Sequence, residues 1–220
     1  AAHSLPLAQI MGFTNRQLRQ PPRAVQRKRL TLLAGNLLVV LAVFLYLGKA
    51  SAPIELGRHH PLDMTSLRQH WAQGEMLVVV RHLERCDHSQ QPCLAGTSGI
   101  TRRAVDVASS LGNEFRQLGL ANSDVFNSPL ERTLQSARLI FGSASTTQDW
   151  LATCKKTMDK DVLAHKQARR NLILVTHSEC IAQLEQAMHL KPITLDYGTA
   201  LFIVAGPAAA TPQVLGYIDS

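Results

Sequence analysis

Several features that mark common functional classes are missing from this sequence. Its 220 residues contain no internal repeat and no low-complexity tract, which argues against a solenoid or a disordered chain. The cysteines form no Cys-x2-Cys pair, so the spacing typical of a structural zinc site is absent. The first 29 residues contain neither Asp nor Glu, and residues 30–48 contain no charged residue.

This uneven distribution of acids explains the positive charge of the chain. The formal net charge is +7, of which residues 1–29 carry +6, because they hold six Lys and Arg without a counter-charge. The remaining residues carry 17 Lys and Arg against 16 acids and are nearly neutral. A basic surface for DNA or RNA is therefore not indicated in the body of the protein, and we predict no nucleic-acid partner.

The uncharged run 30–48 is the longest apolar stretch of the chain, with Asn36 as its one strongly polar residue. At about 1.5 Å per residue such a helix spans roughly 30 Å of hydrocarbon, so we predict a transmembrane anchor. The basic tail 1–29 would stay in the cytoplasm, and a linker, 49–74, would follow outside. Two alternatives are a buried soluble helix and a signal peptide cleaved near Ala52.

All four cysteines follow the apolar run: Cys86, Cys93, Cys154 and Cys180. An even count in an exported domain favours disulfides, and four cysteines allow three pairings. Cys86 and Cys93 bracket one short loop and are the natural pair, which leaves Cys154 with Cys180. A zinc site or a nucleophilic Cys86 is the weaker alternative.

From residue 75 onward the sequence alternates between strand and helix patterns. Mostly apolar runs predict strands at 76–80, 172–175, 201–204 and 214–218, and a further short strand is expected at 124–127. Helical patterns are found at 101–118, 129–141, 161–169 and 178–188. Alternation of this kind is typical of an α/β domain, so we expect residues 75–220 to form a three-layer, mainly parallel sheet with helices on both faces.

Three of the predicted strands end in polar residues. The first ends in Arg81-His82, the second leads through Ser128 to Arg132, and the third ends in His177. Ligands of open α/β sheets bind at the carboxyl ends of strands, so these side chains can meet although each alone is usually structural. Ser128, followed by Pro and a first-turn Glu, is expected to cap the next helix. Arginines, histidines and helix N-termini together predict a site for a dianion such as phosphate.

The motifs at these strand ends resemble those of the histidine phosphatase (phosphoglycerate mutase-like) superfamily. RHLER is similar to its R-H-G-E-T signature, NSPLERTLQSA to its S-P-L-x-R-T motif, and ILVTHSE to its second-histidine strand. GITRRAVDVA is a weaker match, and the likeness covers about residues 76–205. The spacing of the cysteines further resembles that of exported members that act on lipopolysaccharide core.

The resemblance implies a division of roles. His82 would be the nucleophile that becomes phosphohistidine, and Arg81, Arg132 and a protonated His177 would bind the transferring phosphoryl group. It implies neither a metal nor a cofactor. The positions agree with the physics, because a neutral imidazole can attack phosphorus while cations neutralise the equatorial oxygens.

Two departures from the superfamily pattern affect the chemistry. Leu83 stands where the signature has glycine, which could narrow the pocket. The glutamate that many relatives carry after the third strand is missing, so the general acid is open. Glu179 is placed like the acid of one branch of the superfamily, or it is a carboxylate of the first helical turn that the helix dipole stabilises. Asp159 and Asp161 are nearby, although a solvated helix face is their more usual role. Glu84 is expected to bind phosphate in a catalytic role or to orient the pocket in a structural one.

We therefore expect an exported phosphomonoesterase for a phosphorylated glycan, such as a heptose phosphate of lipopolysaccharide core. It would be held in the bacterial inner membrane by a single span, with its catalytic domain in the periplasm. Alternatives are a general sugar-phosphate phosphatase and a phosphate-binding member without turnover. Arg85, Lys155 and Lys156 at the pocket would favour a bulky anionic substrate, although solvated surface charge is the usual role of such residues.

Overall fold

The computed structural model describes residues 33, 35–41, 55–56, 61–154, 157–206 and 211–219. The chain divides into the units Ala1–Ala50 and Ser51–Ser220. In the first unit, residues 33 and 35–41 are helical, and most of the predicted span 30–48 lies outside the described residues. Among the residues described, no helix has the length and apolar character needed to cross a membrane.

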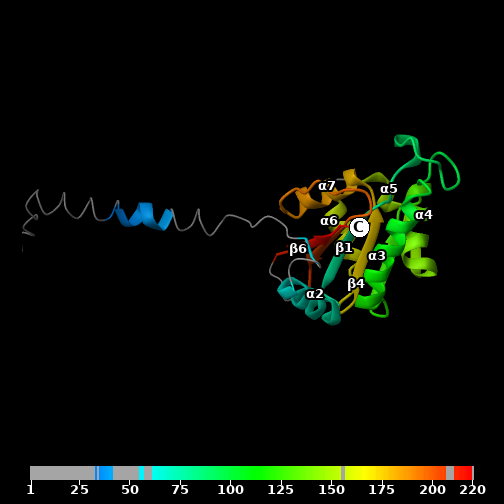
Figure 1. Cartoon of the computed structure of the whole chain (residues 1–220). Helices are drawn as coiled ribbons and strands as arrows, with labels where there is room; N and C mark the ends of the chain where they lie inside the picture. Colours follow the sequence, from blue (N-terminus) through cyan, green and yellow to red (C-terminus); the bar gives the residue numbers. More distant parts are fainter. Residues whose placement is uncertain are drawn as a thin grey trace, which may run out of the picture. The chain divides into compact units, whose positions relative to one another are not determined.

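The second unit alternates between strands and helices along the chain (Figure 1). Its strands are β1 (Met76–Arg81), β2 (Ser123–Asn127), β3 (Ser145–Thr147), β4 (Asn171–Thr176), β5 (Ala200–Val204) and β6 (Gln213–Ile218). Its α-helices are α2 (Pro61–Gln73), α3 (Ala104–Leu118), α4 (Glu131–Phe141), α5 (Trp150–Thr153), α6 (Met158–His165) and α7 (Ser178–Ala187), with short 3-10 turns η1 (Cys86–His88) and η2 (Gly142–Ala144).

The strands form one mixed sheet in the order β3-β2-β4-β1-β5-β6. Strands β1, β4, β2 and β3 run parallel to one another, whereas β5 and β6 add an antiparallel edge. The register pairs Arg81 with Thr176, and Asn127 with Val175, so β1, β4 and β2 end at the same edge of the sheet. The predicted, mainly parallel α/β sheet is confirmed.

Side chains of the central strand alternate between two apolar layers, as the two-residue period of a strand requires. Val78 and Val80 of β1 pack in the layer beneath α3 and α4, whereas Leu77 and Val79 pack in the layer against α6 and α7. Figure 1 shows these pairs of helices on opposite faces of the sheet. The central strands are continuously apolar because both of their faces are buried.

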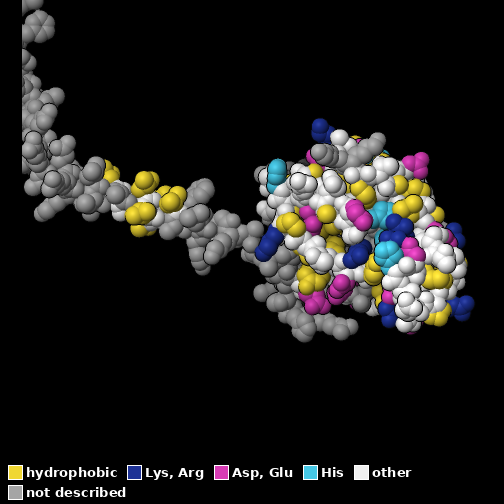
Figure 2. Space-filling model, turned by 90° about the horizontal axis from the view of Figure 1, so that it is seen from above, with side chains coloured by type: hydrophobic (Ala, Val, Ile, Leu, Met, Phe, Trp, Pro, Cys, Tyr) yellow, Lys and Arg dark blue, Asp and Glu magenta, His cyan; other side chains and the backbone are white. Residues whose placement is uncertain are grey.

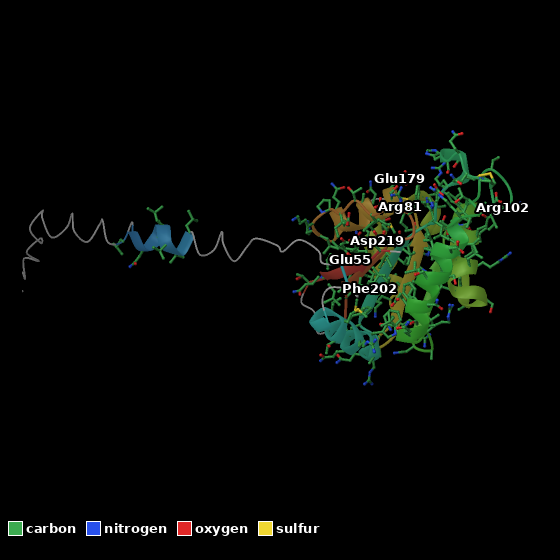
Figure 3. The ribbon with its side chains drawn as sticks, in the orientation of Figure 1. Glu55, Arg81, Arg102, Glu179, Phe202 and Asp219 are labelled. Atoms are coloured by element: carbon green, nitrogen blue, oxygen red, sulfur yellow. A yellow bond between two sulfur atoms is a disulfide. The ribbon has the colours of Figure 1, made fainter. Side chains whose placement is uncertain are left out.

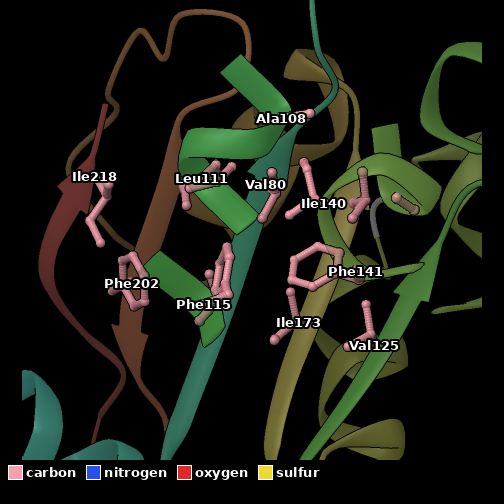
Figure 4. Close-up of a cluster of buried hydrophobic side chains, with 14 of the residues drawn as sticks. Val80, Ala108, Leu111, Phe115, Val125, Ile140, Phe141, Ile173, Phe202 and Ile218 are labelled. Carbon is pink, nitrogen blue, oxygen red and sulfur yellow. The ribbon is translucent and has the colours of Figure 1, made fainter. Parts of the chain in front are cut away.

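The core beneath α3 is centred on Phe115 (Figure 4). Its ring lies 4.8 Å from that of Phe141, 6.1 Å from that of Phe202 and 6.1 Å from that of Trp71. Trp71 belongs to α2, which lies within the residues 49–74 that the sequence suggested as a linker. Because α2 supplies Leu67 and Trp71 to the core, it is part of the folded domain.

All four predicted helices are present with shifted ends: the one expected at 101–118 begins at Ala104, and the one expected at 178–188 ends at Ala187. The helix expected at 161–169 runs from Met158 to His165 and stops because Lys166 becomes extended and donates its ammonium to the carbonyls of Gly74 and Arg170, at 2.8 and 2.7 Å. The helix expected from 129 begins at Glu131. The prediction that Ser128 caps it is wrong, because the N-cap residue is Leu130 and no side chain caps the first turn.

Both disulfides have the expected pairing, Cys86 with Cys93 and Cys154 with Cys180. The first closes the loop that follows β1. The second fastens the first turn of α7 to the segment after α5. Since the sulfur of Cys86 is bonded in this way, neither a zinc ligand nor a free nucleophile is present at that position.

Truncation of the core ring tests this packing. We expect Phe115→Ala to lower the free energy of unfolding by about 3–5 kcal/mol, because it removes a fully buried ring and leaves a cavity. Urea unfolding followed by circular dichroism measures the change, with the exposed Ser109→Ala on the same helix as control. A loss below about 1 kcal/mol would contradict the described core.

Candidate active site

The carboxyl ends of three adjacent parallel strands bring the predicted basic residues to one place. His82 follows β1, and its backbone N–H donates to the carbonyl of Thr176 at the end of β4, at 2.9 Å. Ser128 follows β2, and its N–H donates to the carbonyl of Val175 at 3.1 Å. His177 follows β4 directly, as predicted, and is the N-cap residue of α7. Strand pairing therefore places these three residues beside one another.

His82 is held as a neutral imidazole with one free nitrogen. Its side chain is 3% exposed, and Nδ1 lies 2.7 Å from the carbonyl oxygen of Leu83. A carbonyl can only accept, so Nδ1 carries the proton and Nε2 presents a lone pair. Burial lowers the pKa of His82 to about 3, and the nearby His177, Arg132 and Arg81 lower it further against the effect of the Leu83 hydrogen bond.

His177 lies opposite this imidazole, with the two ring centroids 5.5 Å apart. Nε2 of His177 is 2.9 Å from the hydroxyl of Ser128, which also accepts a long hydrogen bond from the N–H of Leu130. In the tautomer that keeps the proton of His177 on Nδ1, the hydroxyl donates to Nε2, and Nδ1–H is then a donor for a bound oxyanion. The serine expected to cap α4 thus orients the second histidine.

The protonation state of His177 in the free protein is set by its burial. Burial lowers its pKa to about 4, and the charge of Arg132 adds to this, against the opposing effect of Glu179. The ring is therefore neutral at pH 7 in the free protein rather than protonated. A bound dianion would raise the pKa of His177 again, because it stabilises the charged form.

The two predicted arginines are held beside the histidines. Arg81 donates Nη1 to the carbonyl of Leu195, and its guanidinium lies 4.1 Å from the centre of the Tyr197 ring. Burial is the main cause that lowers the pKa of Arg132, and the positive charge of Arg85 is the second. Salt bridges within the described part of the chain involve neither Arg81 nor Arg132. Their positive charges are thus available to a ligand.

Three buried nitrogen atoms of this group have no hydrogen-bond partner among the described residues: Nε of Arg81, Nε of Arg132 and Nδ1 of His177. A buried polar group without a partner costs about 1–3 kcal/mol, so native structures keep few of them. An oxyanion with several acceptor oxygens would satisfy all three and would lie beside the lone pair of His82. The donor set fits phosphate and shows no arrangement suited to a metal.

Glu84 is held in place by three neighbouring side chains. Its carboxylate accepts hydrogen bonds from Thr101 at 2.8 Å, Ser89 at 3.1 Å and the guanidinium of Arg103. The hydrogen bond from Arg103 is the main reason that its pKa is lowered to about 2. With its oxygens engaged in this way, Glu84 fastens the loop after β1 to the segment at the start of α3, which agrees with a structural or orienting role.

Glu179 (labelled in Figure 3) lies on the first turn of α7, directly after the N-cap residue His177 and Ser178. A hydrogen bond from its own backbone N–H lowers its pKa, and the charges of His177 and Arg132 act in the same direction. The carboxylate is therefore ionised at neutral pH in the free protein. Arg85 is bound to Asp87 at 2.6 Å, but its charge also reaches Arg132 and His177.

The other predicted residues lie elsewhere or outside the description. Leu83 is fully buried in the core beneath α3 and does not narrow the site. Asp159 and Asp161 are in the first turn of α6. Lys155 and Lys156 lie outside the described residues.

Sequence reasoning missed the segment that precedes β5. Tyr197 packs on His82, with their ring centroids 5.5 Å apart, as well as on Arg81. The N–H of Gly198 donates to the carbonyls of Arg81 and His82, at 3.1 and 3.3 Å. Because β5 runs antiparallel to β1, it begins at the edge of the sheet where β1 ends. An antiparallel assignment of β5 would therefore have placed the polar turn Asp196–Thr199 beside the site.

Viewed from above, the domain displays this mixture of groups on one face. Figure 2 shows histidine, arginine or lysine, and acidic side chains gathered around apolar ones. In Figure 3, Arg102 lies further out, near the Cys86–Cys93 disulfide, and its Nε donates to the carbonyl of Cys93 at 3.1 Å. The face combines a basic centre with a rim of mixed charge.

Solved structures define the class of protein to which this fold belongs. A protein histidine phosphatase SixA bound to tungstate superimposes with a TM-score of 0.53 and 11% identity, over 66% of this chain and 96% of that one. A phosphoserine phosphatase from Entamoeba histolytica gives a TM-score of 0.50 and 15% identity, over 66% and 97%. The chain has the histidine phosphatase fold.

Sequence relatives narrow the assignment. A lipopolysaccharide core heptose(II)-phosphate phosphatase of Salmonella typhi is 29% identical over 192 residues, covering 83% of this chain and 90% of the relative. One from Salmonella choleraesuis is 30% identical over 141 residues, covering 60% and 67%. No protein-family model matches. The chain belongs to the family of the lipopolysaccharide core heptose(II)-phosphate phosphatases, and it is a phosphatase.

The lowered pKa values make the stability of the domain depend on pH. The unfolded chain protonates histidines below about pH 6.5, whereas His82 and His177 resist protonation until about pH 3 and 4. The free energy of unfolding should therefore fall as the pH is lowered from 7 to 4, by on the order of 3 kcal/mol for each histidine.

Urea unfolding at a series of pH values measures this slope. His82→Asn and His177→Asn should each flatten it, because asparagine does not titrate. An equal slope in the wild type and in His82→Asn would show that the buried histidine is not held neutral.

Proposed function

We propose that this phosphatase removes phosphate from a phosphorylated glycan through a phosphohistidine at His82. The observation that carries the proposal is the lone pair of His82 Nε2 beside three buried donors without partners. A nucleophile within a pre-formed set of donors is what phosphoryl transfer requires, because its catalysis consists mainly of positioning and electrostatic stabilisation.

In the first step, Nε2 of His82 forms a bond to phosphorus while the bond from phosphorus to the sugar oxygen breaks. The pair of electrons from that bond leaves with the oxygen, and the Leu83 carbonyl stabilises the positive charge that develops on the imidazole. Arg81, Arg132 and His177 donate to the equatorial oxygens as their charge redistributes. Water then attacks phosphorus and releases inorganic phosphate and free His82.

Proton transfer is assigned to Glu179. The leaving oxygen needs a proton, and the water of the second step must lose one. Glu179 is ionised in the free protein, which suits the base of the second step. A bound dianion would raise its pKa and let it carry the proton required in the first step.

The identity of the substrate rests on the relatives. They are named as phosphatases of heptose(II) phosphate in lipopolysaccharide core, and this chain covers 90% of the length of one of them. A phosphorylated heptose of a lipopolysaccharide core is therefore the substrate we propose. General activity on sugar phosphates is the alternative outcome of the assay.

We further propose that the domain is exported and anchored by residues 30–48 in a bacterial inner membrane, with the catalytic domain in the periplasm. Two disulfides in one domain favour an oxidising compartment. The described part of the apolar run is helical, and its large side chains are exposed, from 55% at Leu41 to 70% at Leu37. Lipid would cover such a surface.

Replacement of the nucleophile tests the reaction. His82→Ala should lower phosphate release from lipopolysaccharide core by at least about 10³-fold, because no other group can form the covalent intermediate. The wild type incubated with labelled substrate and quenched in alkali should carry acid-labile phosphate that His82→Ala lacks. The control His88→Ala should keep full activity. Activity that survives His82→Ala would refute the nucleophile, and release from sugar phosphates alone would favour the general phosphatase.

A second experiment tests the anchor. Leu37→Arg together with Val40→Arg should move the full-length chain from the carbonate-resistant membrane fraction to the soluble one, because each arginine costs about 2.5–3.5 kcal/mol at the centre of a span. The control Arg23→Ala with Arg27→Ala should remain in the membrane. A wild-type chain found wholly in the soluble fraction would contradict the anchor.

A further inference from the structure

A cavity lies beside the group of basic residues that we propose to bind phosphate. It has a volume of about 330 Å³ and is lined by Glu84, Arg103, Ala104, Val107, Asp196 and Tyr197. This volume is at the lower end of the range for small-molecule pockets. The start of α3 forms one wall and the turn before β5 forms the other.

Tyr197 connects this cavity to the reacting group. The same ring that lines the cavity lies 4.1 Å from the guanidinium carbon of Arg81 and 5.5 Å from the ring of His82. A molecule whose phosphate rests on Arg81 can thus place its next group against Tyr197. The cavity continues the phosphate site in the direction of the remainder of the substrate.

The charges of the cavity select the kind of group that fits. The carboxylate of Glu84 is neutralised by Arg103, which binds both of its oxygens. Asp196 is exposed, and no described residue donates a hydrogen bond to its carboxylate. The cavity therefore carries about one net negative charge and disfavours a second phosphate.

Its remaining surface is apolar and aromatic. Val107 and Ala104 of α3 line the cavity together with the Tyr197 ring. A sugar ring presents C–H groups on its faces, which pack on an aromatic ring, and hydroxyls at its rim, which donate to a carboxylate. A polyhydroxylated ring without charge matches both the apolar wall and the free carboxylate.

We infer that this cavity, the Tyr197 pocket, binds the sugar ring that carries the scissile phosphate, with Tyr197 as the packing surface and Asp196 as the acceptor of its hydroxyls. This inference rests on the proposed function and deepens it, because it assigns residues that discriminate sugar phosphates from other phosphate esters. Arg81, His82, Arg132 and His177 then act on the phosphoryl group alone.

The test compares substrates that differ in the group attached to phosphate. The full-length enzyme is assayed with phosphorylated core oligosaccharide and with a hexose 6-phosphate, which have a sugar ring, and with acetyl phosphate, whose leaving group is too small to reach the cavity. The measured quantity is the ratio of kcat/KM for each sugar substrate to kcat/KM for acetyl phosphate.

We expect Asp196→Ala to lower this ratio about tenfold, because a charged acceptor of hydrogen bonds is lost. Val107→Phe should lower it by a similar factor by filling the cavity. Asp106→Ala and Ser109→Phe, on exposed positions of the same helix α3, are the matched controls and should leave the ratio unchanged.

The outcomes separate the two proposals. A ratio that changes less than about twofold in both Asp196→Ala and Val107→Phe, with the wild type active on sugar phosphates, overturns the pocket and leaves the proposed function intact. A wild type that hydrolyses hexose phosphate but not the core, with a reduced ratio in the variants, supports the pocket and refutes the proposed substrate. A wild type active on acetyl phosphate alone refutes both.

Discussion

The parallel pairing of β1, β4 and β2 is the constraint on which the site depends. It ends three strands at one edge of the sheet, where His177 lies 2.9 Å from the Ser128 hydroxyl and its ring centre lies 5.5 Å from that of His82. The helices that follow, α4 and α7, cover opposite faces, so the basic side chains converge above the edge. Because the surroundings are buried, the imidazoles stay neutral, and one of them keeps a lone pair for phosphorus.

The burial that stabilises the sheet also removes polar groups at this edge from water. The apolar layers on both faces stabilise the sheet, but the same burial leaves Nε atoms of two arginines and Nδ1 of His177 without acceptors among the described residues. Such groups reduce the stability of the free protein and gain free energy when an oxyanion binds. The fold therefore holds the phosphate site ready in advance, and the surrounding loops, fastened by Glu84 and the Cys86–Cys93 bond, limit its rearrangement.

The adjoining cavity shows how specificity can be separated from chemistry. The basic group acts on the phosphoryl oxygens of any ester, whereas the Tyr197 pocket contacts only what is attached to them. Its acidic balance, with Asp196 unpaired among the described residues, contrasts with the positive charge a few ångströms away. A substrate with one phosphate and an uncharged polyhydroxylated neighbour matches both halves.

The sequence by itself determined the alternation of strands and helices, the sheet with helices on both faces, the cysteine pairing and the basic residues at strand ends, because hydrophobic period and local spacing encode these features. Only the tertiary structure decided that Ser128 orients His177 instead of capping α4, that Glu84 pairs with Arg103, and that α2 belongs to the core. It also brought Tyr197 to the site through the antiparallel β5. These outcomes depend on contacts between residues far apart in the chain and on burial, which no local pattern records.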